Sequence, residues 1–506
     1  MISEEDREPA IVPSVARVLD ARIWAPLAFL LPFALFALAL PPGVSFWDTG
    51  EMQTIPYILG ISHPTGFPTF VFAGWLFSHA LPLGTVAWRI GILTAAAMAA
   101  AAYFAYRAVV ELDGTRLLGF GSALVFACGY VVWTRGSRTE VHALSLAFAC
   151  AAICLLLRWR TSGDTRMLSL AALSEGLGLA THGVTVLLLP GLILLLFPRV
   201  RLVGWPALAR AAACFVAPGL LYAYLPLRSA YVYARNIDPT LSLGLPPGRP
   251  FWDFGHPATL ASLIHYLGGG DDSKVGQGFA SMLDLARYRL VIWKFGDDAI
   301  NEFGIVALVL AGAGLLLLAR RQPYLALAFA VTCGLCIPYA LLYPEADPER
   351  YLLLPFWGLA VLAAIGATRG IAAYLNRSGT AIEGFAALLV LVLGLGLFNA
   401  NRGVFAQRHN RAGDIYIDTV IALTPSNAVI VANWAFATPL GYAAFVDHRL
   451  GDRIVVTAQP ADYREYYAGW MKTRPVYVIA DQEYPVEGYR QIRLFRYPAI
   501  ARLEPQ

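Results

Sequence analysis

Residues 141–157 read VHALSLAFACAAICLLL and contain no Asp, Glu, Lys or Arg, and this stretch decides the class of fold. A helix needs roughly 17–25 mostly apolar residues to cross the hydrocarbon core of a bilayer. Glu140 stands immediately before the stretch, and Arg158 and Arg160 follow it. The segment is therefore predicted to be a transmembrane helix whose charged groups lie at its two ends.

The whole chain has the composition of a membrane protein. Of its 506 residues, 58% are hydrophobic and only 14% are charged, and its mean hydropathy is +0.58. A soluble chain is usually about a quarter charged, so too little polar surface remains here to cover a water-exposed globule. The six cysteines all lie in apolar stretches, which gives no reason to expect an external disulfide framework.

About eleven segments are long and apolar enough to be membrane spans. They are residues 23–40, 86–106, 117–133, 141–157, 167–181, 183–197, 211–227, 303–319, 324–343, 352–368 and 381–399. If residues 1–22 form a cytoplasmic N-terminus, every inside connection carries at least two arginines, as the positive-inside rule requires. No signal-peptidase pattern precedes the first span, so we expect it to be retained.

Three longer segments then fall outside the membrane. Two are loops of the membrane domain 23–399, at about 41–85 and about 228–302, and the third is the tail 400–506. The tail alternates short β-rich runs, at 428–432, 453–457 and 476–480, with helical stretches. This alternation predicts a small extracytoplasmic α/β domain.

The first outer loop carries two acids close to the end of the first span. It begins Phe46-Trp47-Asp48-Thr49-Gly50-Glu51 and continues with Ser62-His63-Pro64-Thr65-Gly66-Phe67-Pro68. Asp48 and Glu51 share one face if the loop is helical there, although the same spacing also fits a capping box. Trp47 at the interface would partly desolvate Asp48, which is expected to raise its pKa and its strength as a general base.

Other outer ends of the spans carry further ionisable groups. These are Arg89, Glu140, His182, Arg228 and Arg350. Taken singly, a His or Arg at a span end usually snorkels to the interface or caps a helix. Taken together, they lie on one side of the bilayer, whereas an ion-coupled transporter generally needs charges near the midplane. The placement favours a reaction at the outer interface, with a lipid-linked glycan flippase and a noncatalytic scaffold left open.

The ordered motifs resemble the domain-of-unknown-function 2723 family of membrane proteins, whose vertebrate relative is a protein O-mannosyltransferase. The matching runs are Phe46-Trp47-Asp48-Thr49-Gly50-Glu51, His63-Pro64-Thr65-Gly66-Phe67-Pro68, Trp88-Arg89-Ile90, Glu140-Val141-His142, Gly178-Leu179-Ala180-Thr181-His182 and Tyr224-Leu225-Pro226-Leu227-Arg228. Gly91 departs from the family, which often has an asparagine there, and the choice of acceptor is open for that reason.

The resemblance implies the GT-C architecture, that of multi-span glycosyltransferases that take a sugar, with mannose as the candidate, from a polyprenyl phosphate. The sugar would pass with inversion to a hydroxyl of a protein or glycan, with Asp48 as the base and Glu51 as its helper. The resemblance also implies groups that bind the donor phosphate or the substrate. They would be Arg89, Arg228, His63, His182, Arg350, Glu140 and Trp47.

Cofactors and location are less defined by the residues. A divalent cation held by Asp48, Glu51, His63 and Glu140 is left open, because no tight zinc-type ligand spacing is present. No nucleotide-binding or nucleic-acid-binding signature is found. The chain has only three lysines among its many arginines, which is typical of a GC-rich bacterial genome. We therefore expect a bacterial plasma membrane location, with the site facing the periplasm or exterior.

Overall fold

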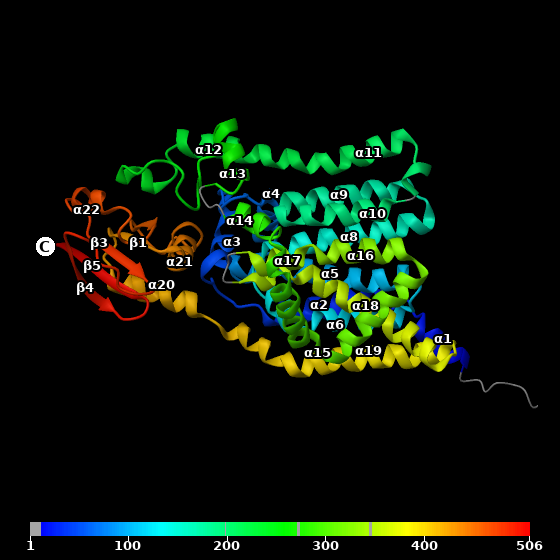
Figure 1. The fold of residues 1–506 in the computed structure, drawn as a ribbon. Helices are drawn as coiled ribbons and strands as arrows, with labels where there is room; N and C mark the ends of the chain where they lie inside the picture. Colours follow the sequence, from blue (N-terminus) through cyan, green and yellow to red (C-terminus); the bar gives the residue numbers. More distant parts are fainter. Residues whose placement is uncertain (1–11, 198, 271–273, 344–346) are drawn as a thin grey trace, which may run out of the picture.

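The protein is a long helical bundle with a separate C-terminal domain at one end. The computed structural model describes residues 12–197, 199–270, 274–343 and 347–506. The helix α1 (Val12–Leu19) lies at the end of the bundle opposite the C-terminal domain (Figure 1). Residues 1–11 of the predicted cytoplasmic N-terminus lie outside the described residues.

The helical part contains all the segments that were predicted as spans. In chain order its elements are α2 (Trp24–Ala39), α3 (Trp47–Ile58), α4 (Pro68–Ala80), α5 (Val86–Glu111), α6 (Arg116–Ala127), α7 (Tyr130–Gly136), α8 (Val141–Ser162), α9 (Thr165–Thr181), η2 (Gly183–Leu188), α10 (Leu189–Leu196), η3 (Arg199–Leu202), α11 (Trp205–Val216), η4 (Ala217–Ala223), α12 (Tyr224–Ala234), η5 (Pro239–Leu243), α13 (Leu260–Leu267), α14 (Lys274–Ser281), η6 (Leu285–Arg287), α15 (Tyr288–Arg321), α16 (Pro323–Gly334), α17 (Cys336–Leu342), η7 (Pro348–Tyr351), α18 (Leu353–Leu375) and α19 (Thr380–Asn401).

The helices support a multi-pass membrane protein. Within the described residues, seven helices are long and apolar enough to cross a membrane, and the bent pair α6 and α7 makes an eighth. The three other predicted spans are shorter: α2 has 16 residues, α9 has 17, and the apolar run Gly183–Leu196 is shorter still. The multi-pass helical prediction is therefore confirmed, and the count of about eleven crossings stays a prediction.

Small residues allow two of the long helices to touch along their backbones. A Cβ atom on Gly366 of α18 would lie 1.8 Å from the carbonyl oxygen of Leu310 on α15. A Cβ atom on Gly314 of α15 would lie 2.1 Å from the carbonyl oxygen of Leu362. Such close approaches are how helices associate in a membrane, where apolar burial gives little driving force. They fix the position of α18, which begins shortly after Arg350.

A sharp bend between α6 and α7 shapes the outer end of the bundle. The two helices differ in direction by 77°. The buried carboxylate of Glu302 on α15 accepts hydrogen bonds from the backbone N–H groups of Val131, at 2.8 Å, and Val132, at 3.1 Å. A carboxylate satisfies the otherwise unpaired N–H groups at the start of a helix. The bend therefore directs two elements toward the outer loops: α7, which carries Arg135, and the turn after it, which carries Arg138.

The first outer loop folds into the helices α3 and α4. Leu59 takes a left-handed backbone conformation and ends α3. Pro68 is the first residue of α4, a position at which the helix has no use for a backbone N–H group, so that proline is tolerated there. His63 lies on the connection between them and is thereby folded back over α3.

The C-terminal residues form a five-stranded sheet with the strand order β2-β1-β3-β5-β4. The elements after α19 are η8 (Arg402–His409), α20 (Ala412–Leu423), β1 (Val429–Ala432), α21 (Trp434–Phe445), β2 (Ile454–Thr457), α22 (Arg464–Trp470), β3 (Val476–Ala480), β4 (Tyr489–Phe495) and β5 (Ala499–Pro505). Strands β2, β1 and β3 are parallel, and β5 and β4 pair antiparallel. The three runs predicted as strands in this region are β1, β2 and β3.

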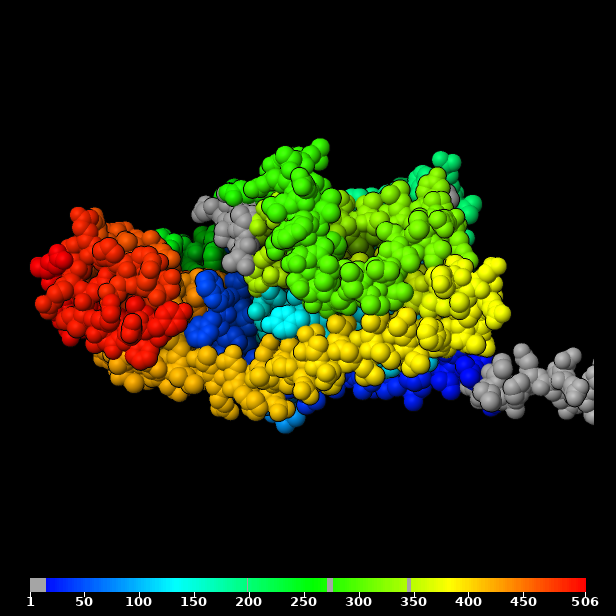
Figure 2. All heavy atoms as spheres, turned by 60° about the horizontal axis from the view of Figure 1, so that its bottom comes forward, coloured from blue at the N-terminus to red at the C-terminus, as the bar shows by residue number. Residues whose placement is uncertain are grey.

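The sheet domain is attached to the first outer loop and to the start of α5 through α21. The hydroxyl of Tyr442 accepts a hydrogen bond from the backbone N–H of Ala87 at 3.1 Å, and the rings of Phe46 and Phe436 meet edge to face at 6.0 Å. In the space-filling view, part of the N-terminal segment (blue) lies between the C-terminal domain (orange and red) and the membrane helices (Figure 2). This arrangement brings α21 against α3, where Asp48 is located.

Candidate active site

Asp48 lies in the first turn of α3 and is held by two residues that are distant in the sequence. Its Oδ2 accepts a hydrogen bond from Nη1 of Arg350 at 3.1 Å, and its Oδ1 accepts one from Nε1 of Trp434 at 2.9 Å. The side chain of Asp48 is still 41% exposed. A carboxylate has about four lone-pair positions, so Asp48 can accept further hydrogen bonds from a substrate.

The environment of Asp48 lowers its pKa. Burial acts to raise the pKa, but the charges of His63 and Arg350 and the hydrogen bond from Trp434 outweigh it. The expectation that Trp47 would raise the pKa of Asp48 is therefore wrong. The ring of Trp47 is 63% exposed, and it is the neighbouring cations that decide the sign.

Glu51 and His63 form a buried pair next to Asp48. The fully buried carboxylate of Glu51 accepts hydrogen bonds from the backbone N–H of His63 at 2.8 Å and from its Nδ1 at 2.5 Å. Burial lowers the pKa of His63, but Glu51 and Asp48 outweigh it and raise the pKa to about 9. Burial also raises the pKa of Glu51 against the effect of His63. His63 is thus an imidazolium at neutral pH, with Glu51 as its counter-ion.

The capping interpretation of the Asp48 and Glu51 spacing is wrong. The residue that precedes α3 is Phe46, and no side chain caps the helix start. Glu51 instead uses both carboxylate oxygens on His63. The two acids therefore have different roles, because one is open to solvent and the other is enclosed.

A second charged network surrounds Glu140. Its Oε1 accepts hydrogen bonds from Nη1 of Arg135 at 2.8 Å and from Nη2 of Arg138 at 2.7 Å. Both arginines also bond Asp347. Burial acts to raise the pKa of Glu140, but Arg138 and the neighbouring charges lower it below its ordinary value. Glu140 is therefore an ionised anchor for two arginines.

Aromatic rings connect the two networks. His182 stacks on Phe67, with 5.4 Å between ring centroids and 7° between planes. His142 lies 4.5 Å from His182 and meets the ring of Tyr351 edge to face at 5.0 Å. His182 also accepts a backbone hydrogen bond from Val184 through Nδ1, at 3.2 Å. His182 is thus part of the aromatic contact between the Asp48 network and the Glu140 network.

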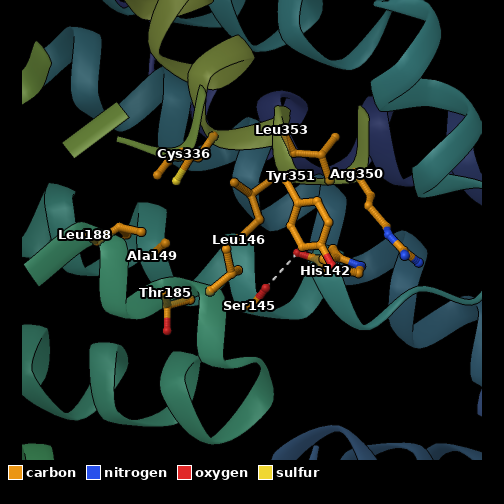
Figure 3. A pocket seen from close by; sticks show the side chains of 12 residues that line it. His142, Ser145, Leu146, Ala149, Thr185, Leu188, Cys336, Arg350, Tyr351 and Leu353 are labelled. Atoms are coloured by element: carbon orange, nitrogen blue, oxygen red, sulfur yellow. Dashed lines mark hydrogen bonds between the residues drawn. The ribbon is translucent and has the colours of Figure 1, made fainter. Parts of the chain in front are cut away.

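A mostly apolar pocket opens beside these residues. Its lining comes from α8, η2, α17, η7 and α18: His142, Ser145, Leu146, Ala149, Val184, Thr185, Leu188, Cys336, Arg350, Tyr351, Leu353 and Leu354. Figure 3 shows Leu188, Ala149 and Cys336 on one side and His142 and Arg350 on the other, with the guanidinium pointing away from the apolar part. The pocket has an apolar body and a cationic end.

Two predicted phosphate-binding arginines lie outside this cluster. The guanidinium of Arg89 donates to the backbone carbonyls of Ser78, Leu83 and Gly84 at 2.9–3.1 Å. Arg228 donates to the carbonyl of Ile58 at 3.0 Å, at the end of α3 opposite Asp48. Both therefore have structural contacts of the capping kind, and the structure does not bring them to Asp48.

The predicted cation ligands are engaged with one another or with arginines. Glu51 binds His63, Glu140 binds Arg135 and Arg138, and Asp48 binds Arg350. In the described part of the chain, no three His, Cys, Asp or Glu side chains are grouped so that they could hold a metal ion. The divalent cation therefore remains a prediction without a set of ligands.

Sequence reasoning missed Trp434, Arg135 and Arg138. Trp434 gives no local signal, because its contact with Asp48 joins residues 386 positions apart. The two arginines do give one. The predicted topology puts them on the outer side of the bilayer, where arginines are under-represented in short loops. An arginine pair at such a position therefore predicts a charged partner or a ligand.

Comparisons with known proteins support the predicted resemblance over part of the chain. The profile of the family described as "Protein O-mannosyl-transferase TMEM260 N-terminal domain" matches residues 48–202. The mouse protein O-mannosyl-transferase TMEM260 is 27% identical over 242 residues, which are 46% of this chain and 32% of that protein. The corresponding Dictyostelium discoideum protein is 30% identical over 124 residues, 24% of this chain and 15% of that protein. The chain thus spans about a third or less of the length of these relatives.

A solved structure covers nearly the whole chain. The crystal structure of ArnT from Cupriavidus metallidurans bound to undecaprenyl phosphate aligns with 96% of this chain and 100% of its own, with a TM-score of 0.57 and 10% sequence identity. At this level of identity the likeness concerns the fold alone. The chain therefore has the ArnT fold, in agreement with the GT-C-like architecture predicted from its motifs, and its N-terminal part is similar to protein O-mannosyl-transferases.

Proposed function

We propose that the chain is a GT-C type glycosyltransferase. It transfers a sugar, with mannose as the first candidate, from a polyprenyl phosphate to a hydroxyl of a protein or glycan on the outer side of the membrane. One observation carries the proposal: Arg350 both lines the apolar pocket and donates a hydrogen bond to Asp48. A lipid phosphate bound at this guanidinium would lie beside an ionised, partly exposed carboxylate.

The donor fits the two ends of the pocket. Its phosphate would meet the guanidinium of Arg350. Its polyprenyl chain is far larger than the cavity of about 30 Å³ and would extend beyond the apolar lining, such as Leu146, Leu188 and Leu354. An arginine side chain that is held in place and donates hydrogen bonds to the leaving phosphate stabilises the negative charge that develops on it during transfer. The undecaprenyl phosphate bound in the ArnT structure is a ligand of this chemical class.

The transfer is a direct displacement at the anomeric carbon. The acceptor oxygen forms a bond to that carbon while the bond from the carbon to the phosphate oxygen breaks, and the electron pair leaves with the polyprenyl phosphate. The acceptor proton passes to Asp48 and from there to water. Because its pKa is lowered, Asp48 is fully ionised at neutral pH and accepts the proton late, as the acceptor oxygen becomes bonded to carbon. Attack opposite the phosphate inverts the configuration.

Glu51 acts through His63 and has no direct contact with substrates. It is fully enclosed and both its oxygens face His63. The imidazolium that it stabilises lies near Asp48 and keeps that acid ionised. Glu51 is therefore a positioning residue, which specifies how it would act as the helper of Asp48.

The test uses the full-length protein in membranes of the producing cells, which supply natural acceptors. The membranes receive undecaprenyl phosphate carrying radiolabelled mannose, with a glucose donor in parallel, and label in the lipid-extracted residue is counted. Asp48→Asn is expected to lower transfer by at least about 100-fold. Asp418→Asn is the matched control, since it removes a carboxylate that is paired with Arg449 and 63% exposed on the C-terminal domain. Full transfer by Asp48→Asn contradicts the proposal.

The flippase alternative makes a different prediction for the same variants. A transporter of lipid-linked glycans would move its cargo without covalent transfer, so Asp48→Asn would leave translocation of a fluorescent polyprenyl phosphate sugar intact while no label enters protein or glycan in either variant. The position of Asp48 at one end of α3, outside the membrane-spanning helices, favours the enzyme. We further propose a bacterial plasma membrane, with this site on its periplasmic or exterior side.

A further inference from the structure

The C-terminal domain places one residue in direct contact with Asp48. Trp434 is the first residue of α21, immediately after β1 and Asn433. The backbone N–H of Asn433 donates to the carbonyl of Ile479 at the end of β3, at 3.1 Å. Trp434 therefore stands at the carboxyl edge of the parallel strands, the edge at which α/β sheets usually present ligand-binding residues.

Two ring contacts and the packing of α21 on α3 support the contact between Trp434 and Asp48. The Trp434 ring meets His63 at 6.1 Å and Phe254 at 6.0 Å, both close to edge to face. The next turn of α21 presses on α3, because a Cβ atom on Gly50 would lie 3.0 Å from Oγ1 of Thr438. An indole held in this way has little freedom to turn its N–H away from Asp48.

We infer that the C-terminal domain is part of the active site, and that Trp434 is a positioning residue that fixes the Asp48 carboxylate for proton transfer. The inference rests on the proposed function. Arg350 holds Oδ2 and Trp434 holds Oδ1, so the two donors together set the rotation of the carboxylate plane. With only one donor, the plane could rotate and the free lone pairs would no longer point in one direction.

A purely structural role would look different, and the same domain offers the comparison. Trp470 on α22 is buried, whereas Trp434 is half-buried. The Nε1 of Trp470 donates to the backbone carbonyl of Leu243 in the second outer loop at 2.9 Å. Both tryptophans thus link the C-terminal domain to an outer loop through one indole hydrogen bond. Only Trp434 donates to a group that we place in the reaction.

The experiment compares Trp434→Phe with Trp470→Phe in the full-length protein, using the undecaprenyl phosphate mannose assay across pH. Phenylalanine keeps a ring and removes the N–H. Other groups that face Asp48 are unchanged: Glu51 on its own helix, His63 on the following loop and Arg350 on η7. A lost hydrogen bond to a carboxylate raises its pKa, so activity should disappear at a higher pH on the acid side.

For Trp434→Phe we expect kcat/KM at neutral pH to fall roughly 10-fold and the acid limb of the profile to move up by about 1 pH unit, with donor KM unchanged. Trp470→Phe should lose a similar amount of thermal stability while its acid limb stays in place. Coincident acid limbs for wild type and Trp434→Phe, or an equal move in both variants, overturn the inference. Because Asp48→Asn is measured alongside, failure of the inference with an inactive Asp48→Asn leaves the proposed function standing.

Discussion

Replacing Glu51 with glutamine tests the buried ion pair on which the site depends. Glutamine has nearly the same size and keeps an oxygen that can accept the 2.8 Å hydrogen bond from the backbone N–H of His63. It removes the negative charge that faces Nδ1 of His63 at 2.5 Å. The imidazolium of His63 then loses its enclosed counter-ion, and burial, which favours the neutral ring, is opposed by Asp48.

The size of the effect follows from the pKa of His63. Burial lowers this pKa, but Glu51 and Asp48 raise it from the ordinary 6.5 to about 9. At ~1.4 kcal/mol per pKa unit the rise is equivalent to roughly 3 kcal/mol of folding free energy, and the raised pKa of Glu51 acts against part of it. Since the folded-state pKa is the raised one, this stabilisation is complete below about pH 6.5 and is lost as the pH rises through about 9. We expect this stabilisation to be roughly 2–3 kcal/mol at pH 7, about 1 kcal/mol at pH 8 and almost none at pH 10.

The assay is thermal unfolding of the full-length protein in detergent, followed by circular dichroism from pH 6 to pH 10. The difference between wild type and Glu51→Gln should be largest at pH 6 and should close by pH 10. Glu111→Gln is the matched control, because Glu111 is 5% exposed and pairs with Arg107 at 2.6 Å, and arginine stays charged over this range. Its difference from wild type should therefore not close. A Glu51→Gln difference that is absent at pH 6, or that is the same at pH 6 and pH 10, refutes the ion-pair reasoning.

Two further pairs of variants test the supports of the site by the same thermal unfolding measurement. Arg135→Gln should destabilise the protein by roughly 3 kcal/mol, because the Arg135 side chain is 7% exposed and its loss leaves Glu140 with one buried partner fewer. Arg138→Gln should destabilise it by only about 1 kcal/mol, because the Arg138 side chain is 35% exposed. Equal losses of stability in the two variants contradict this ranking. Gly441→Ala should destabilise the docked domain by about 2 kcal/mol, since its Cβ would lie 2.2 Å from the Phe251 ring. Gly469→Ala, with no atom within 4 Å of its Cβ, should be neutral or slightly stabilising, and an equal loss in both glycine variants shows that packing on Phe251 is not the cause.

The apolar pattern was sufficient to predict the helices because each membrane helix must satisfy its own backbone and therefore needs a continuous apolar run. The same reasoning does not extend to short helices. The 16 residues of α2 fit both a helix that crosses a thinned bilayer and a helix that crosses it only in part. The strands of the tail could be predicted because β1, β2 and β3 are short buried runs that are rich in β-branched residues.

The site was predictable only where partners are close in the sequence. Glu51 and His63 belong to one loop, so their pairing follows from local folding. Arg350 was identified by its position at a span end, but so was Arg89, and nothing in the residue type distinguishes the arginine that reaches Asp48 from the one that binds carbonyls. The contact from Trp434 depends on how a separate domain docks, which no local pattern encodes.

The helical connection between α19 and α20 limits how the tail of this protein can change in length. Residues Thr380–Leu423 form a run of 44 residues from the membrane to the sheet domain that is helical except at Asn410 and Arg411. Each inserted residue in a helix turns everything beyond it by about 100° and advances it by about 1.5 Å. Seven inserted residues would nearly restore the angle, yet they would push the domain about 10 Å outward. Neither change leaves the indole of Trp434 within 2.9 Å of Asp48, so substitutions should be tolerated in this connection far better than insertions or deletions.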